Sequence, residues 1–168
     1  AAVTAETMYS PPIPVRYHAA KQTRLPAIEA TKVEGDLHYK EGHARANDWL
    51  INWTDTEDQI TWEIEVVEAG NYQIEVEYVV SEEHLGSILV LSGGESSLTN
   101  TITEAFNPLE LPSPDRIERK EVYEKEWAKL SMGELWLEKG VQQIELAAMK
   151  VANEEVMELK SVYLTRNF

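Results

Sequence analysis

The sequence predicts an all-β domain, an antiparallel β-sandwich or jelly roll. Apolar and polar residues alternate over residues 60–66 and again over 72–80, with turn-forming residues 69–71 between them. A period of two on both sides of a turn is typical of half-buried strands and does not fit the 3.6-residue period of a helix. About eight to ten short segments of this kind follow one another at the spacing of sandwiches and jelly rolls. We therefore expect stacked sheets and no long helix.

Taken in chain order, the elements form one domain with a short extension. Residues 1–14 hold three prolines and are expected to be an extended lead-in, and residues 15–168 a single β-sandwich domain. Strands are expected at residues 15–20, 25–33, 60–66, 72–80, 86–91, 96–103, 127–137, 141–149 and 157–165, with Ile28 in the core. We expect antiparallel hairpins about the turns at 69–71 and 139–140, and a turn at 93–95 with 96–103 as the partner strand of 86–91. Parts of 35–56 are expected to be loop, and 107–114 irregular.

Composition excludes several classes of function. The chain has 15 Lys and Arg against 30 Asp and Glu, a formal charge of −15, which repels nucleic acid and anionic membrane surfaces. It has no cysteine, so disulfides, thiolate nucleophiles and Cys-based zinc sites are excluded. No run is apolar enough to span a bilayer. The five Trp and seven Tyr suit sugar or protein surfaces, although use in a core is commoner.

Three stretches carry a resemblance to known domains. Residues 60–72, 135–146 and 159–165 resemble the corresponding parts of carbohydrate-binding modules of families 6 and 35. Those modules are galactose-binding-like jelly rolls, and the likeness covers roughly residues 27–166. The resemblance implies a β-sandwich whose loops at one end hold a polysaccharide or other glycan.

A narrower resemblance concerns the order of four short motifs. Residues 12–15, 23–27, 52–58 and 86–87 follow one another as in the C-terminal β-sandwich of many bacterial arylsulfatases, and the run Asn52-Trp53-Thr54 is the most specific piece. This resemblance implies a secreted or periplasmic protein, a non-catalytic role, and a sulfatase catalytic domain as a covalently linked or packed partner.

No catalytic motif is present. The segment Ser113-Pro114-Asp115-Arg116 has the wrong spacing for a sulfatase nucleophile, and neither a Gly-x-Ser-x-Gly elbow nor a His-Glu-x-x-His motif occurs. Most carboxylates alternate with apolar residues and are expected on wet strand faces. His38 and His43 lie on an irregular segment, where two imidazoles rarely converge on a metal, and His84 is interpreted as a surface residue. We expect no enzyme activity.

The resemblance also bears on metal binding. In the sugar-binding families, a structural calcium ion uses acidic residues near the first core strand and an Asp at the start of the last strand. Glu29 fits the first position, but Thr31 and Lys160 stand where acidic residues are expected. Because an ammonium group repels a divalent cation, we expect no calcium there and no cofactor. A pair between Lys160 and Glu29 is the alternative.

Sugar binding requires flat apolar faces and groups that hydrogen-bond hydroxyls. The candidate ligand-binding residues are Tyr39, Trp49, Asn52, Trp53, Trp127, Asn153 and Glu154, with Tyr123 as a further aromatic. Trp49 and Trp53 have an alternative use as plugs of the sandwich end, and the sequence leaves both uses open. Trp62 is expected in the core, and Trp136 on an outer face where it could meet a partner domain.

Two functions remain. The first is a non-catalytic carbohydrate-binding-module-like accessory domain of a secreted sulfatase-like protein. The second is a structural domain that packs against a sulfatase catalytic domain and binds no sugar. A sulfated glycan is conceivable because basic residues are concentrated in the N-terminal quarter, at Arg16, Lys21, Arg24, Lys32, Lys40 and Arg45.

Overall fold

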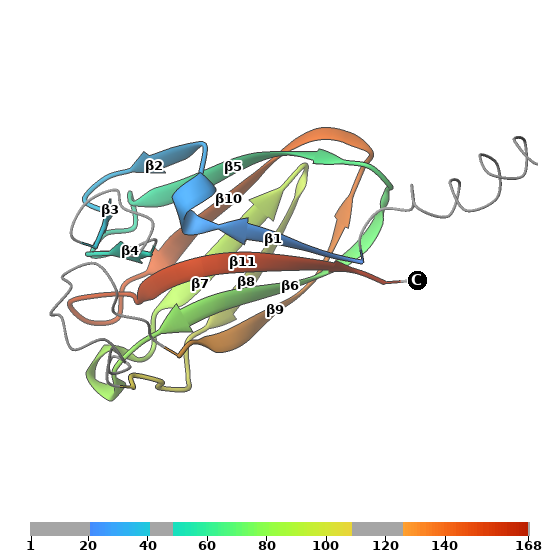
Figure 1. Ribbon diagram of the computed structural model, residues 1–168. Coiled ribbons are helices and arrows are strands. Elements are labelled where there is room, and N and C mark those ends of the chain that lie inside the picture. Colours follow the sequence, from blue (N-terminus) through green and yellow to red (C-terminus); the bar gives the residue numbers. More distant parts are fainter. Residues whose placement is uncertain (1–20, 41–48, 109–125, 168) are drawn as a thin grey trace, which may run out of the picture.

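Two antiparallel sheets face each other across a hydrophobic core, as predicted (Figure 1). The computed structural model describes residues 21–40, 49–108 and 126–167. The predicted lead-in, the predicted strand at 15–20, His43 and Tyr123 lie outside these residues.

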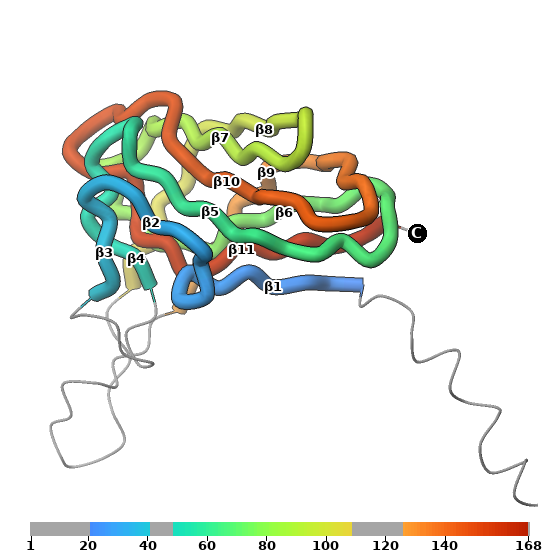
Figure 2. The backbone as a smooth tube through the Cα atoms, turned by 90° about the horizontal axis from the view of Figure 1, so that it is seen from above, coloured from blue at the N-terminus to red at the C-terminus, as the bar shows by residue number. Residues whose placement is uncertain are grey.

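The first sheet, called sheet A, is built around the last strand of the chain. Its order is β3-β4-β11-β6-β9, and β1 also pairs with β11. Its strands are β1 (Gln22–Pro26), β3 (His38–Tyr39), β4 (Leu50–Ile51), β6 (Gly70–Val79), β9 (Ala128–Leu137) and β11 (Glu158–Arg166). Figure 2 shows β1 running beside β11 along one edge of the molecule.

The second sheet, sheet B, has the order β2-β5-β10-β7-β8. Its strands are β2 (Lys32–Glu34), β5 (Gln59–Val66), β7 (Ile88–Gly93), β8 (Ser96–Thr101) and β10 (Gly140–Lys150). Two 3-10 turns, η2 (Ala27–Glu29) and η3 (Glu82–His84), complete the described elements. The predicted strands from residue 86 onward are confirmed as β7 to β11, with ends shifted by one or two residues.

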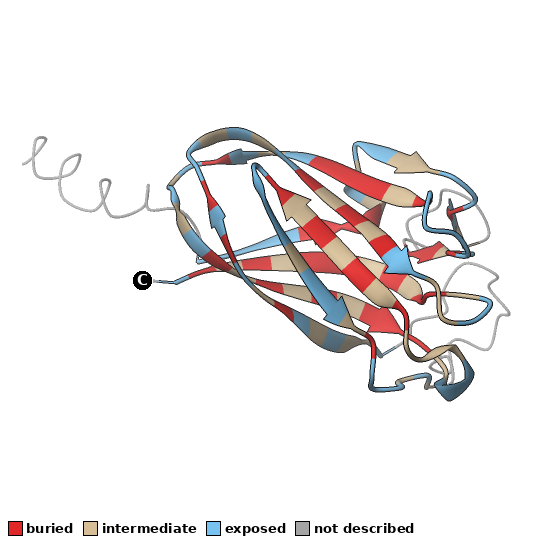
Figure 3. Cartoon of the chain, turned by 180° about the vertical axis from the view of Figure 1, so that it is seen from behind, coloured by how far each residue is buried: buried red, intermediate tan, exposed pale blue. Residues whose placement is uncertain are grey.

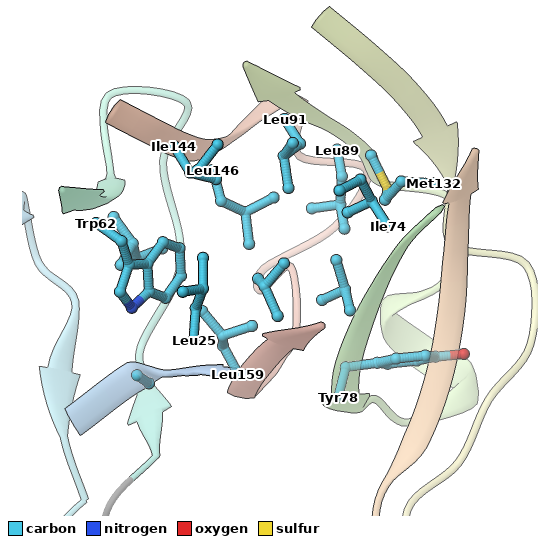
Figure 4. Packing of buried hydrophobic residues seen from close by; sticks show 14 of the residues in the cluster. Leu25, Trp62, Ile74, Tyr78, Leu89, Leu91, Met132, Ile144, Leu146 and Leu159 are labelled. Carbon is cyan, nitrogen blue, oxygen red and sulfur yellow. The ribbon is translucent and has the colours of Figure 1, made fainter. Parts of the chain in front are cut away.

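The core lies between the inward faces of the two sheets. Burial alternates along most strands, as the banding in Figure 3 shows, because successive side chains of a strand point to opposite faces. Residues from both sheets meet in the close view of Figure 4, among them Ile74 and Leu159 of sheet A with Leu91 and Leu146 of sheet B. Trp62 is in this core, as predicted, and its indole N–H donates to the Pro26 carbonyl at 2.9 Å.

Two of the three predicted strand pairings are wrong, although their strands exist. The third, between 86–91 and 96–103, is confirmed as β7 paired with β8. β5 belongs to sheet B and β6 to sheet A, so the turn between them joins the sheets instead of pairing two neighbours. The same is true of β9 in sheet A and β10 in sheet B. Strands that face each other across a core bury alternate residues as strands that pair do, so periodicity does not distinguish the two arrangements.

The predicted strand at 25–33 is also wrong as a single element. The chain leaves sheet A at Pro26, makes the turn η2, and enters sheet B at Lys32. Proline has no N–H to continue a ladder, which favours a strand end at that point. Ile28, expected in the core, lies in the turn and is only partly buried.

The two ends of the sandwich differ. One end, here called the loop end, carries β3, β4, η3 and the segment 151–157 before β11 (Figure 1). The other, the turn end, carries the short connections at 67–69 and 138–139.

Candidate functional site

The loop end gathers the predicted ligand-binding residues. Tyr39 is in β3, and Trp49, Asn52 and Trp53 flank β4. The remaining three are Trp127 immediately before β9 and Asn153 and Glu154 before β11. The fold therefore brings distant parts of the chain to one end, but it gives these side chains different roles.

Trp53 plugs the end of the core. It is 0% exposed and belongs to the cluster between the sheets. Its carbonyl accepts a hydrogen bond from the Val156 amide at 2.7 Å, which ties the chain after β4 to the loop before β11. Within the part of the chain that the structure describes, its indole N–H has no hydrogen-bond partner. Trp53 offers no ring face to solvent, and the alternative use named above is the one observed.

Asp58 organises the segment that contains Trp53. Its carboxylate is buried and accepts three backbone hydrogen bonds, from the amide of Asp36 at 2.8 Å and those of Thr54 and Asp55 at 3.1 Å each. Gly35 lies against it with φ +86°, and a Cβ at that position would collide with the Asp58 carboxylate. A buried carboxylate is tolerated where its oxygens are hydrogen bonded, as here.

Asn52 takes part in the same loop structure. It has φ 62°, a left-handed conformation that asparagine adopts more readily than most residues. Its side-chain amide donates to the Asp36 carbonyl at 3.1 Å. The run from Asn52 to Asp58, the most specific part of the arylsulfatase resemblance, thus serves loop geometry and core closure. Sequence reasoning did not identify Asp58.

Tyr39 is also engaged within the fold. It is half-buried against the core, and its hydroxyl donates to the Ala27 carbonyl at 2.8 Å. Burial raises the pKa of Tyr39 above its usual value of 10.0. Its phenol holds η2 beside β3.

Trp49 and Trp127 meet outside the central core. Their ring centroids are 5.5 Å apart with an interplanar angle of 66°, an edge-to-face contact. Lys40 Nζ lies 4.9 Å from the Trp49 centroid, and Lys160 Nζ lies 5.7 Å and 5.8 Å from the Trp49 and Trp127 centroids. These four residues are here called the aromatic–lysine cluster. Trp49 is 1% exposed, whereas Trp127 is partly open to solvent.

The position of Lys160 corrects one expectation. Within the described residues Lys160 makes no ion pair with Glu29, and its ammonium lies over the two indole rings, a cation–π arrangement. Thr31 Oγ1 accepts a hydrogen bond from the Glu63 amide at 2.8 Å. The ammonium group of Lys160 cannot act as a calcium ligand, and the Thr31 hydroxyl oxygen already accepts a hydrogen bond.

Asn153 and Glu154 are exposed in the loop before β11. The Asn153 amide donates to the Leu85 carbonyl at 3.2 Å, which links this loop to the chain after η3. The loop is therefore held at both sides, by Asn153 to Leu85 and by Val156 to Trp53.

A polar pocket lies beside this loop, and sequence reasoning missed it. It has a volume of about 150 Å³ and is lined by Val79, Val80, Ser81, His84, Asn107, Glu155, Met157 and Glu158. Ser81 Oγ and His84 Nδ1 are hydrogen bonded at 3.2 Å. These residues come from three separate connections and from the adjoining ends of β6 and β11, so no local motif marks them. His84 is only partly exposed, which modifies its interpretation as a surface residue.

Metal binding and membrane spanning find no support among the described residues. In residues 21–40, 49–108 and 126–167, no three His, Cys, Asp or Glu side chains are arranged to hold a metal ion. His38 is exposed, with Nδ1 3.0 Å from the Asp36 carbonyl oxygen. The same residues contain no helix that is both long and apolar enough to cross a bilayer.

Comparisons with known proteins give matches in structure only. No family model matches the chain, and no curated protein matches it. A family 35 carbohydrate-binding module from an environmental isolate matches with a TM-score of 0.58 and 12% identity, over 86% of this chain and 93% of that one. The C-terminal family 6 module of LamC, a laminarinase of Zobellia galactanivorans, matches with a TM-score of 0.54 and 14% identity, over 86% and 99%.

The third match is to part of a larger enzyme. The GH26-CBM35 β-(1,4)-mannanase of Podospora anserina matches with a TM-score of 0.56 and 12% identity. The match covers 89% of this chain, which spans only 28% of the mannanase. A mosquito-larvicidal toxin of Bacillus thuringiensis also contains a similar segment, so likeness at this level concerns the fold. The chain shares the galactose-binding-like β-sandwich fold of family 6 and family 35 carbohydrate-binding modules.

Proposed function

We propose that this chain is a non-catalytic carbohydrate-binding accessory domain that holds a glycan at its loop end. The observation that carries the proposal is the partly open Trp127 ring, backed by the buried Trp49 and by Lys160. A pyranose has an apolar C–H face that can stack on an aromatic ring. Because Trp127 packs against Trp49 and Lys160, its side chain loses little conformational entropy when a ligand binds.

Polar groups for the sugar hydroxyls are available at the same end. Asn153 and Glu154 are exposed on a loop that is anchored at Leu85 and Trp53. An amide and a carboxylate between them supply donors and acceptors for hydroxyl groups. Ligand sites of this kind combine an apolar surface with a few polar groups that set orientation.

The two lysines of the aromatic–lysine cluster favour a glycan that carries sulfate esters. Lys40 and Lys160 place positive charge beside the Trp49 and Trp127 rings, on a chain whose formal net charge is −15. A local pair of ammonium groups can attract an anionic substituent that the average charge would repel. We further propose that the chain belongs to a secreted sulfatase-like protein, which the motif order in the sequence supports.

A binding measurement tests the proposal directly. Trp127→Ala is expected to weaken binding to any polysaccharide that retains the wild-type protein by at least about tenfold. A central aromatic ring commonly dominates the binding energy of a small interface. Affinity electrophoresis against neutral and sulfated polysaccharides provides the measurement. Met149→Ala, which removes an exposed apolar side chain from β10 of sheet B, is the matched control and should bind normally.

The outcome separates the parts of the proposal. Equal retention by wild-type protein and a folded Trp127→Ala variant would exclude this site. Equal binding of neutral and sulfated polysaccharides, without weakening by salt, would exclude the sulfate preference, because screened surface charges lose their effect at high ionic strength.

A structural role is the second candidate. It is favoured by the burial of Trp49 and Trp53 and by the use of the Asn52 amide within its own loop. In that case the exposed Trp136, rather than Trp127, would face a sulfatase catalytic domain. A glycan array without any signal for neutral or sulfated glycans, measured on folded protein, would favour this function over the first.

A further inference from the structure

We propose that the polar pocket at the loop end is a subsite for one terminal sugar residue without an acidic group, a neutral hexose or a hexosamine. The inference rests on the proposed function, because it assigns the end of the same glycan whose next residue stacks on Trp127. The pocket residues were not among those predicted from the sequence.

The first argument is size. A cavity of about 150 Å³ is below the roughly 300–1,000 Å³ of pockets for drug-sized ligands. The pocket therefore suits one small ring, such as the end of a glycan, rather than several sugar residues at once.

The second argument is the distribution of polar and apolar groups. Val79, Val80 and Met157 form apolar parts of the lining, and the remaining members are polar. A pyranose has the matching character, with apolar C–H faces and a rim of hydroxyl groups. Asn107 supplies a donor and an acceptor, and Glu155 supplies acceptors for adjacent hydroxyls.

The third argument is charge. Glu155 places a carboxylate in the lining, and the chain carries a formal charge of −15. A uronate or a sulfated residue in the pocket would meet a like charge, whereas a protonated amino sugar would be attracted. The pocket and the aromatic–lysine cluster thus have opposite charge preferences, and the two together would select a glycan with an unsulfated end.

The fourth argument is position. Glu158 of β11 is paired with Val79 of β6. On the other side of β6, Trp127 directly precedes Ala128, which is paired with Tyr78. Two strand spacings of about 4.8 Å separate β11 from β9, so the backbones of Glu158 and Trp127 lie about 10 Å apart at the loop end of sheet A. This distance suits neighbouring residues of one glycan chain.

The test uses the whole chain and single sugars. Glucose, glucosamine and glucuronate are titrated into ¹⁵N-labelled protein, and amide chemical shifts are followed by NMR. We expect weak, saturable shifts at Ser81, His84 and Asn107 with glucose and glucosamine, with dissociation constants on the order of millimolar. Glucuronate is expected to bind most weakly.

Two variants place the binding in the pocket. Asn107→Ala and Glu155→Gln should each weaken the response to glucosamine by about fivefold or more, an effect of the size expected when one hydrogen bond is lost. Glu83→Gln removes an exposed carboxylate from η3 beside His84 without altering the lining, and should leave the response unchanged.

The outcomes separate this inference from the proposed function. Polysaccharide binding without sugar-dependent shifts in the pocket would overturn the subsite and leave the proposed function standing. Pocket shifts without polysaccharide binding would overturn the proposed function and keep the pocket as an isolated sugar site. A pocket response to glucuronate equal to that for glucosamine would overturn the assignment of sugar class.

Discussion

The two ends of the sandwich are closed in different ways. At the loop end, the Asp58 carboxylate, the Asn52 amide and the Asn153 amide all bond to backbone groups, and Trp53 fills the space between the sheets. At the turn end, short connections leave an apolar cavity of about 250 Å³, and the nearly buried Arg166 pairs with Glu68.

The difference shows that the loop end carries structure beyond what is required to connect the two sheets. Turn-end connections such as 67–69 and 138–139 do little more than carry the chain from one sheet to the other. The loop end holds the polar pocket and the aromatic–lysine cluster in addition to its closing contacts. Loops held by a rigid scaffold are the usual location of binding residues, which supports the assignment of function to this end.

The largest effect is expected from removing the plug at the loop end. Trp53→Ala should lower the free energy of unfolding by about 3–5 kcal/mol, because it leaves a large cavity in a packed core. Trp136→Ala, which removes the half-exposed indole near the turn end, should change it by less than about 0.5 kcal/mol. Urea unfolding followed by fluorescence of the remaining tryptophans measures both. Equal effects would contradict the difference between the ends.

A smaller effect is expected at Asp58. Asp58→Asn keeps the shape of the side chain but weakens three backbone hydrogen bonds, and should lower stability by about 1–3 kcal/mol. The matched control is Asp55→Asn, an exposed side chain that bonds the Glu57 amide at 3.0 Å. Thermal unfolding compares the two. A loss at Asp55 as large as that at Asp58 would show that the buried carboxylate has no special role.

The smallest effect concerns alkaline pH and both ends of β6. Burial raises the pKa of Tyr72 at the turn end. The pKa of Tyr78 at the loop end is raised mainly by burial and to a smaller extent by repulsion from Glu104. A raised folded-state pKa gives stability that is fully present below the unfolded value near 10.0 and is lost as pH rises through the folded pKa. Stability should therefore fall above about pH 10.

Phenylalanine variants sharpen this prediction. Both hydroxyls donate to backbone carbonyls, Tyr72 to Glu68 at 2.6 Å and Tyr78 to Glu104 at 2.9 Å, and a phenolate could not donate. Tyr72→Phe and Tyr78→Phe should each be less stable near neutral pH but lose less stability between pH 9 and 11. A melting temperature that falls equally in wild type and both variants over that range would contradict the assignment.

Much of the fold was predictable because alternation of apolar residues reports burial. Ile60, Trp62 and Ile74 are buried as their spacing predicts. Pairing was predictable only in part. β7 and β8 pair as their Gly-containing turn predicts, but β5 and β6 bury alternate residues whether they lie side by side or in opposite sheets. The motif Leu135-Trp136-Leu137 shows the same limit. Its outward Trp136 was predicted, but not the fact that its strand ends in sheet A and the next begins in sheet B.

The candidate site was less predictable than the fold. Aromatic and amide residues at 39–53 suggest a ligand surface, yet their hydrogen bonds and burial depend on contacts with Asp36, Ala27 and the loop before β11. The polar pocket joins residues from three connections, and single polar residues in loops carry no signal of convergence. Trp127 could be named from its type alone, but its support by Trp49 required the fold.

The central place of β11 in sheet A has a consequence for how the chain reaches its native state. β1, β4 and β6 all pair with this final strand, and Gln22 bonds Thr165 across a separation of 143 residues. Sheets closed by such distant contacts form slowly. Here β1, β4 and β6 cannot complete their pairing until β11 has been synthesised and has left the ribosome. During synthesis β6 would have its β11 edge unpaired, and truncation before residue 158 would leave that state permanent.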